Sequence, residues 1–225
     1  CVKDITVAFS GGIDSTLVAF LAKKYSDIEL ITVGIKNSHD VESAKSAAEL
    51  IGLNLTVLEL SEDELISEAK LLQKKLKLTQ FEVGFMLPFW VVAKNAKNNV
   101  IMCGQGADEV FGGYARFRDP EKNTDLMEET KSLLKIIPNR EEKIAQMFNL
   151  RLSCPYLSDE VIKVSKLYAQ EEHIGTIGKE ILRKSAIKLG LPKEIANRKK
   201  KAAQYGSGSQ KVLKNNIKYE INFEI

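Results

Sequence analysis

Short apolar runs alternate with helix-like segments over the first hundred residues, and this alternation constrains the fold more than any other feature of the sequence. The apolar runs predict strands over Ile5–Phe9, Ile28–Ile35, Asn54–Leu60 and Val100–Cys103. The segments between them predict helices over Asp14–Tyr25, over His39–Ile51 with Asp40 as its N-cap, from the N-cap Ser61 onward, and over Glu82–Lys97 with a kink or boundary at Pro88. Strands that alternate with helices favour an α/β fold with a doubly wound parallel sheet, which we expect to hold about five strands.

Beyond Tyr114 the strand signal disappears. Helical patterns follow over Asp125–Ile137, Arg140–Leu150, Ser158–Ala169, Gly178–Leu189 and Ser209–Ile221. We therefore expect an α/β region over residues 1–115 and a C-terminal helical layer over residues 116–225, packed together as one compact domain.

The composition is that of a chain with one sizeable core. The chain has 225 residues, of which 44% are hydrophobic, and that is enough to bury a large core. No apolar run approaches the ~20 residues of a membrane span, and nothing resembles a signal peptide. The three cysteines, Cys1, Cys103 and Cys154, are too scattered for a disulfide framework. We expect a cytoplasmic protein with no membrane association.

Charge is distributed unevenly along the chain. The net charge is +3, yet the segment from Lys179 to Lys218 carries +10, so the remainder carries −7. A basic segment suits phosphate or nucleic acid, but a solvated helical face has the same composition, so charge alone leaves both readings open.

The stretch Ser10-Gly11-Gly12-Ile13-Asp14-Ser15 follows the first predicted strand and precedes a helix. Ligands of open parallel sheets bind beyond the carboxyl ends of the strands. The two glycines allow the backbone to approach a ligand, the helix N-terminus attracts anions, and the two serine hydroxyls can donate to phosphate oxygens. The stretch matches neither G-x-x-x-x-G-K-[ST] nor G-x-G-x-x-G.

An acid within this turn needs its own explanation. Carboxylate and phosphate repel each other, so Asp14 beside a phosphate indicates a divalent metal between them. The alternative is a tight turn in which Asp14 only caps the helix.

These residues resemble the pyrophosphate loop (PP-loop) of the ATP-pyrophosphatase superfamily, whose members cleave ATP between the α- and β-phosphates and have an adenine nucleotide alpha hydrolase-like fold. The second glycine-rich stretch, CGQGADEVFGGYARF (Cys103–Phe117), resembles the S-G-E-G-[AS]-D-E-[VI]-F-G-G-Y segment of asparagine synthetases and the related β-lactam synthetases. Two further blocks, residues 33–52 and Lys179–Gly208, resemble the same family. The chain is thus similar to the C-terminal synthase domain of asparagine synthetases.

This resemblance implies ATP and Mg²⁺ as cofactors and a role for each matching residue. Ser10, Gly11, Gly12, Asp14 and Ser15 would hold the pyrophosphate portion, and Asp14 and Asp108 would bind Mg²⁺. Val33 and Gly34 would approach adenine, with Cys103 and Gly104 beside the nucleotide. Lys179 and Lys200 would offset charge as pyrophosphate leaves, and Gln105 would face the acceptor substrate.

The sequence departs from the family where the second substrate is expected. Gln105 replaces a carboxylate, and an amide cannot act as a base or hold a cation. Ser153 and Ser158 stand where the family has Arg and Asp, and the acidic pair usual before the Pro88 helix is not evident. Positions that handle ATP are therefore kept, whereas several that face the acceptor are altered.

We expect a ligase that uses ATP and Mg²⁺ to adenylate a carboxylate, aspartate or a relative, and then transfers an amine to it. Because the first predicted strand begins at Ile5, we expect no glutaminase domain, and we expect ammonia to be free or to come from a separate glutaminase subunit. The sequence leaves open whether the protein forms a homodimer. Two other functions also stay open: a PP-loop ATPase that modifies tRNA, with or without sulfur transfer through Cys103 and Cys154, and a non-catalytic nucleotide-binding partner.

Overall fold

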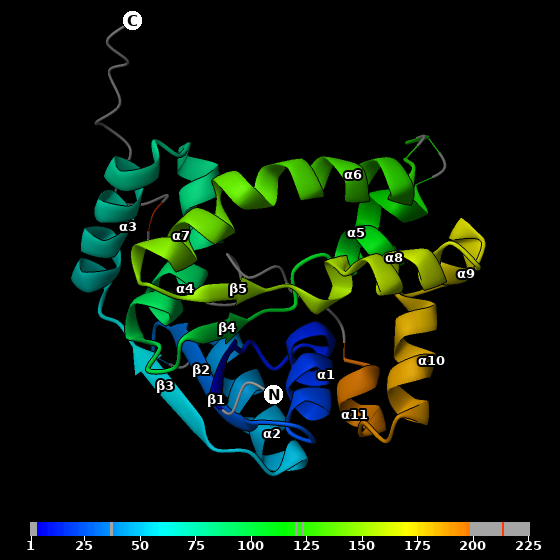
Figure 1. The fold of residues 1–225 in the computed structure, drawn as a ribbon, viewed down its shortest axis with the longest axis horizontal. Helices are drawn as coiled ribbons and strands as arrows, with labels where there is room; N and C mark the ends of the chain where they lie inside the picture. The colour runs from blue at the N-terminus through cyan, green and yellow to red at the C-terminus, as the bar shows by residue number, and fades with distance from the viewer. Residues whose placement is uncertain (1–3, 37, 120, 123, 199–212, 214–225) are drawn as a thin grey trace, which may run out of the picture.

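The computed structural model describes residues 4–36, 38–119, 121–122, 124–198 and 213. Within them, five parallel strands form one sheet with helices on both faces (Figure 1). The strands are β1 (Asp4–Ala8), β2 (Asp27–Gly34), β3 (Leu55–Glu59), β4 (Val100–Met102) and β5 (Arg151–Ser153), in the order β3-β2-β1-β4-β5. The doubly wound parallel α/β fold is therefore confirmed.

The helices of the first half lie close to their predicted places. They are α1 (Ile13–Ala22), α2 (His39–Ile51), α3 (Glu62–Leu76) and α4 (Gln80–Asn95). Ser61 caps α3 as predicted, in a capping box with Glu64. The prediction of Asp40 as the cap of α2 is wrong, because Ser38 is the N-cap and Asp40 lies in the first turn. Pro88 lies inside α4 and does not end it.

The second half is mostly helical. It comprises α5 (Ala107–Phe111), α6 (Leu126–Ile136), α7 (Glu141–Met147), α8 (Asp159–Ser165), α9 (Gln170–Ile174), α10 (Glu180–Lys188), α11 (Lys193–Ala196) and three 3₁₀ turns, Ala115–Arg118, Ile137–Asn139 and Pro155–Leu157. The helix predicted over Ser209–Ile221 lies outside the described residues except for Leu213, which is buried.

The expectation of no strand after Tyr114 is wrong. β5 pairs with β4 from Val100↔Arg151 to Met102↔Ser153, and so the fifth strand comes from the region expected to be only helical. Three residues are too few to show the alternation by which strands are recognised. Its place is set by its neighbours instead, since Arg151 N–H donates to Asn99 O (2.8 Å) and Cys103 N–H donates to Ser153 O (3.2 Å).

Successive residues of the central strands serve opposite faces of the sheet. Leu30 belongs to a core shared with α1, α2, α10 and α11, whereas Ile31 belongs to a core shared with α3, α4 and α7. Figure 1 shows α11 beside α1 and α10 on the far side of α11, although both are far from α1 in sequence. Each such fully buried side chain contributes about 1.5–3 kcal/mol, and together they hold both helical layers on the sheet.

The order of the strands locates a crevice. From β1 the chain proceeds outward through β2 to β3, and it then returns to place β4 on the other side of β1. Ligands of such sheets bind outside the carboxyl ends of the strands at this change of direction. None of the described helices is by itself long and apolar enough to cross a membrane, and α3 and α4 meet that criterion only as a pair bent by 108°.

Candidate functional site

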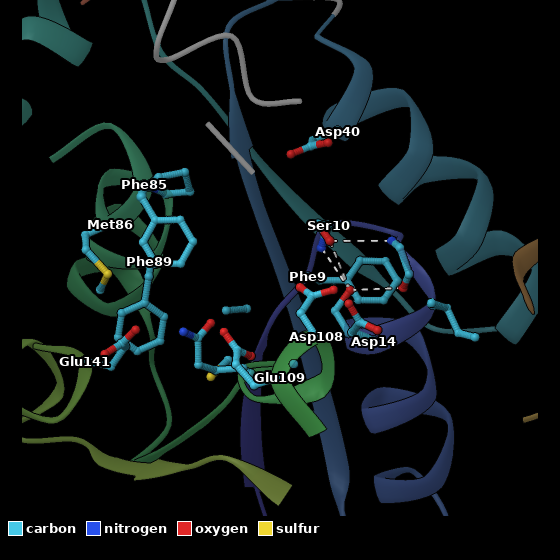
Figure 2. Close-up of a pocket in the computed structure, with 18 of the residues that line it drawn as sticks. Phe9, Ser10, Asp14, Asp40, Phe85, Met86, Phe89, Asp108, Glu109 and Glu141 are labelled. Carbon is cyan, nitrogen blue, oxygen red and sulfur yellow. Dashed lines mark hydrogen bonds between the residues drawn. The ribbon is translucent and has the colours of Figure 1, made fainter. Parts of the chain in front are cut away.

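A cavity of about 490 Å³ lies at the carboxyl ends of β1, β2 and β4 (Figure 2). Its size is that of a small-molecule site. Ten of the residues singled out in the sequence line it: Ser10, Gly12, Asp14, Ser15, Val33, Cys103, Gly104, Gln105, Asp108 and Lys179. Gly11 and Gly34 are not among the lining residues, and Lys200 lies outside the described residues.

The loop between β1 and α1 is closed by its own hydroxyls. The Ser10 amide donates to Ser15 Oγ (3.2 Å), and Ser15 Oγ donates to Gly12 O (3.4 Å). Gly12 is the N-cap of α1 and no side chain caps the helix there. A helix N-terminus of this kind presents backbone N–H groups and the positive end of the helix dipole to an anion.

Gly11 is required by the backbone. Its φ is +71°, and a Cβ at this position would overlap the carbonyl group of Ser43 on α2. Nη1 of Arg198 donates a hydrogen bond of 2.9 Å to this Ser43 carbonyl and another of 2.9 Å to the carbonyl of Gly11. The loop is therefore pressed against α2 and held there by a side chain from nearly 190 positions later.

Two carboxylates and one ammonium group form a cluster beside the loop. Lys179 Nζ lies 2.5 Å from Asp14 Oδ2 on α1 and 2.7 Å from Asp108 Oδ1 on α5. Lys179 is 1% exposed. A Cβ on Gly113 would overlap both Asp108 Oδ1 and Lys179 Cε, so the absence of a side chain there leaves the room that the cluster needs.

The cluster holds Lys179 charged. Burial by itself would lower the pKa of Lys179, but the attraction of Asp108 and then Asp14, with their hydrogen bonds, outweighs it and raises that pKa. Lys179 also has φ +59°, a left-handed conformation that costs a non-glycine residue about 1–2 kcal/mol. Strain of this kind persists where the surroundings fix a residue, and it is common at functional sites.

One carboxylate oxygen of the cluster is left without a hydrogen bond within the described part of the chain. Asp14 Oδ1 is buried and has no hydrogen-bond partner among the described residues. Within the same residues, no group of three or more His, Cys, Asp or Glu side chains could hold a metal ion. A cation at Asp14 would therefore need further ligands from a bound molecule, and phosphate oxygens are of the kind that Mg²⁺ prefers.

One thiol, that of Cys103, lines the cavity, and the thiol of Cys154 lies behind it, outside the lining. Cys103 and Cys154 follow the paired strands β4 and β5, and their Sγ atoms are 3.6 Å apart. The hydrogen bond with Cys103 and then burial raise the pKa of Cys154, so its thiol stays protonated. Sequence spacing alone could not have placed these two residues together.

The structure adds residues that the sequence did not single out. Arg198 lines the cavity and fixes the loop, although the sequence motifs assigned it no role of its own within the basic, family-like segment Lys179–Gly208. Tyr156 Oη donates to Asp14 O (3.0 Å). Buried Arg183 donates to Gly178 O (2.8 Å) and to Ala196 O, and so it joins the segments that carry Lys179 and Arg198.

The comparison with known proteins agrees with the motifs. The sequence model of the asparagine synthase family matches residues 3–152 and 128–222. The chain belongs to the asparagine synthase family. One relative, a putative glutamine-hydrolysing asparagine synthetase of Methanocaldococcus jannaschii, is 30% identical over 93% of the chain. The chain spans 47% of that relative's length.

Two solved structures that the chain resembles show only a weak likeness to it. A predicted subunit of tRNA methyltransferase from M. jannaschii has a TM-score of 0.39 and 16% identity, covering 88% of this chain and 94% of its own. NMN synthetase from Francisella tularensis has a TM-score of 0.41 and 13% identity, covering 99% and 79%. Structural similarity at these TM-scores supports no conclusion about function.

Proposed function

We propose that the protein is an ATP-dependent, AMP-forming carbon–nitrogen ligase. A carboxylate oxygen of the acceptor attacks the α-phosphorus of ATP, and the bond between the α- and β-phosphates breaks to release pyrophosphate. An amine then attacks the acyl carbon of the adenylate, loses a proton, and displaces AMP. Family membership supports the ligase class.

The observation that carries the proposal is the Asp14–Lys179–Asp108 cluster at the N-terminus of α1. The loop Ser10–Ser15 would bind the β- and γ-phosphates through backbone N–H groups and hydroxyls. Lys179, held charged by the two carboxylates, would stabilise the negative charge that develops on the departing pyrophosphate. Val33, at the end of β2, would border the adenine.

Mg²⁺ fits the site as a companion of the nucleotide. Asp14 and Asp108 would hold it together with phosphate oxygens, and the unpartnered Asp14 Oδ1 supplies a ready ligand atom. When bound, the ion would neutralise phosphate charge. We further propose ammonia as the nitrogen source, free or delivered by a glutaminase.

Pyrophosphate and AMP released from ATP, Mg²⁺, ammonia and a panel of carboxylic acids would test the proposal directly. Asp14→Asn and Asp108→Asn should each lower turnover by 100-fold or more, on the order of the loss of one electrostatic group at a reacting phosphate. Asp27→Asn, an exposed change at the opposite end of the sheet, is the matched control and should leave turnover unchanged. Undiminished turnover in both site variants, with wild-type circular dichroism, would refute the assignment.

One observation favours a second candidate. Cys103 lines the cavity, and its Sγ lies 3.6 Å from that of Cys154, a separation compatible with sulfur transfer to an adenylated tRNA base. The raised pKa of Cys154 opposes it, because the thiolate is the nucleophile. Cys103→Ser decides between them: turnover with a small acid survives this change in a ligase, whereas sulfur transfer is lost.

A further inference from the structure

The helix α4 is apolar on more than the side that meets the core. Val83, Leu87 and Trp90 are buried against the sheet. A second stripe at helical spacing lines the cavity and consists of Phe81, Phe85, Phe89 and Val92. Val92 is also part of the core, and Phe85 and Phe89 are half-buried against it. A helix that is apolar all round needs a second apolar partner besides the core.

This second stripe forms one wall of the cavity. Figure 2 shows Phe85 and Phe89 on one side of the space, facing Ser10 and Asp14 on the other. The wall continues to the rim, where Phe81 of α4 is 65% exposed and Ile136 of α6 is 44% exposed. Large apolar side chains left this open at the rim of a cavity point to a ligand with an apolar body.

The charges on this side of the cavity already have partners. Arg116 binds Glu129 through both Nε and Nη2, at 3.3 and 2.8 Å. Arg140 binds Glu141 in the same two-fold way, at 3.0 and 2.7 Å. Gln105, which also lines the cavity, is neutral.

Glu109 is likewise engaged, since it accepts a 2.6 Å hydrogen bond from Tyr114 Oη. An amino acid such as aspartate would bring an ammonium group and a second carboxylate to this side. Both would lose water and would need to displace one of these existing pairs.

From these contacts we propose that the acceptor is a monocarboxylic acid with an aromatic or branched apolar body, which packs against α4 while its carboxylate points toward Gln105 and Lys179. The inference deepens the proposed ligase function and rests on it. It also gives a reason for Gln105: a neutral amide fits an acceptor that has no second charged group to be recognised.

The test compares acids as substrates for pyrophosphate release with ATP, Mg²⁺ and ammonia. We expect kcat/KM for 3-phenylpropanoate or 4-methylpentanoate to exceed that for aspartate by at least about 10-fold, the usual discrimination of an apolar pocket. Phe85→Ala and Phe89→Ala should each lower kcat/KM for the apolar acid by about 10- to 100-fold. The KM for ATP should stay within about twofold of wild type.

Phe20→Ala is the matched control, because Phe20 is a half-buried phenylalanine of α1 that does not line the cavity. Phe85→Leu, which keeps the side chain apolar, should lose less than Phe85→Ala and guards against misfolding of the alanine variant. Thermal melts identify variants that fail to fold.

The outcomes separate this inference from the function on which it rests. Preference for aspartate with normal pyrophosphate release overturns the apolar acceptor and leaves the ligase proposal standing. A rise in KM for ATP in Phe85→Ala that equals the loss for the acid assigns the wall to adenine and also overturns the inference. If no acid supports pyrophosphate release, the ligase function itself fails.

Discussion

Replacing Lys179 by methionine removes one charge and keeps a side chain of similar length. Lys179 is the cation between Asp14 and Asp108, at 2.5 and 2.7 Å. Without it two carboxylates face each other with no charge between them. Removal of one partner from a buried ion pair costs ~3–5 kcal/mol. The aspartate side chains are 20% and 15% exposed, so water lowers the cost and we expect a loss of about 2–4 kcal/mol.

The assay is urea and thermal denaturation followed by circular dichroism. A loss of this size lowers the melting temperature of a domain of this length by about 5–15 °C. Lys184→Met, on the exposed side of α10, is the matched control and should change stability by less than about 0.5 kcal/mol.

The pH dependence identifies the cause of the loss. Because the pKa of Lys179 is raised in the folded state, its stabilising contribution is complete below the unfolded pKa of ~10.4 and is lost only as pH rises through the folded value. Between pH 5 and 8 the wild-type contribution is therefore constant. In the variant, acid relieves the repulsion by protonating one carboxylate, so the stability difference should shrink from pH 8 to pH 5. A difference below about 0.5 kcal/mol, or one that does not change with pH, would refute the role of Lys179 as counter-ion.

Two further predictions concern the loop and α4. Gly11→Ala should abolish ATP binding or destabilise the fold by several kcal/mol, because φ is +71° and the new Cβ overlaps the Ser43 carbonyl. Gly52→Ala is the control, since Gly52 has a similar φ of +63° but open space around it. Thermal denaturation should show a loss of only ~1 kcal/mol for Gly52→Ala. Thr79→Ala removes the cap of α4 and should cost about 1 kcal/mol at pH 7. The hydrogen bonds with Thr79 lower the pKa of Glu82, so this loss should diminish as pH falls through the folded pKa of Glu82, which denaturation at pH 7 and pH 3.5 would detect.

The sequence predicts the sheet where strands are long and fails where they are short. β2 has eight residues, mostly buried, and its apolar run is plain, whereas the three residues of β5 are defined by pairing with β4. Ser38 and Asp40 are both good caps, and only the backbone geometry selects Ser38. Local sequence patterns can therefore predict that a helix is present without fixing the residue at which it begins.

The site is predictable to a similar degree. The glycines and serines of the PP-loop predict an anion site, and the family resemblance predicts that Lys179 lies near it. That Lys179 joins Asp14 to Asp108 depends on tertiary packing, and so does the meeting of Cys103 and Cys154. The second apolar stripe of α4 is hidden in the sequence, because a pattern that is apolar all round does not reveal which face meets the core.

The cavity combines two demands that would conflict on a single surface. Phosphate binding requires exposed N–H groups, a close backbone and concentrated charge, which the loop after β1 and the Lys179 cluster supply. Recognition of an apolar acceptor requires a wall that excludes water, which α4 and α6 supply. The charged side depends on Lys179 and Arg198, which come from the part of the chain after residue 115 yet contact Asp14 and Gly11 from the part before it. Exchange of residues on α4 can therefore alter the acceptor without disturbing the phosphate contacts, since the two walls share no side chain.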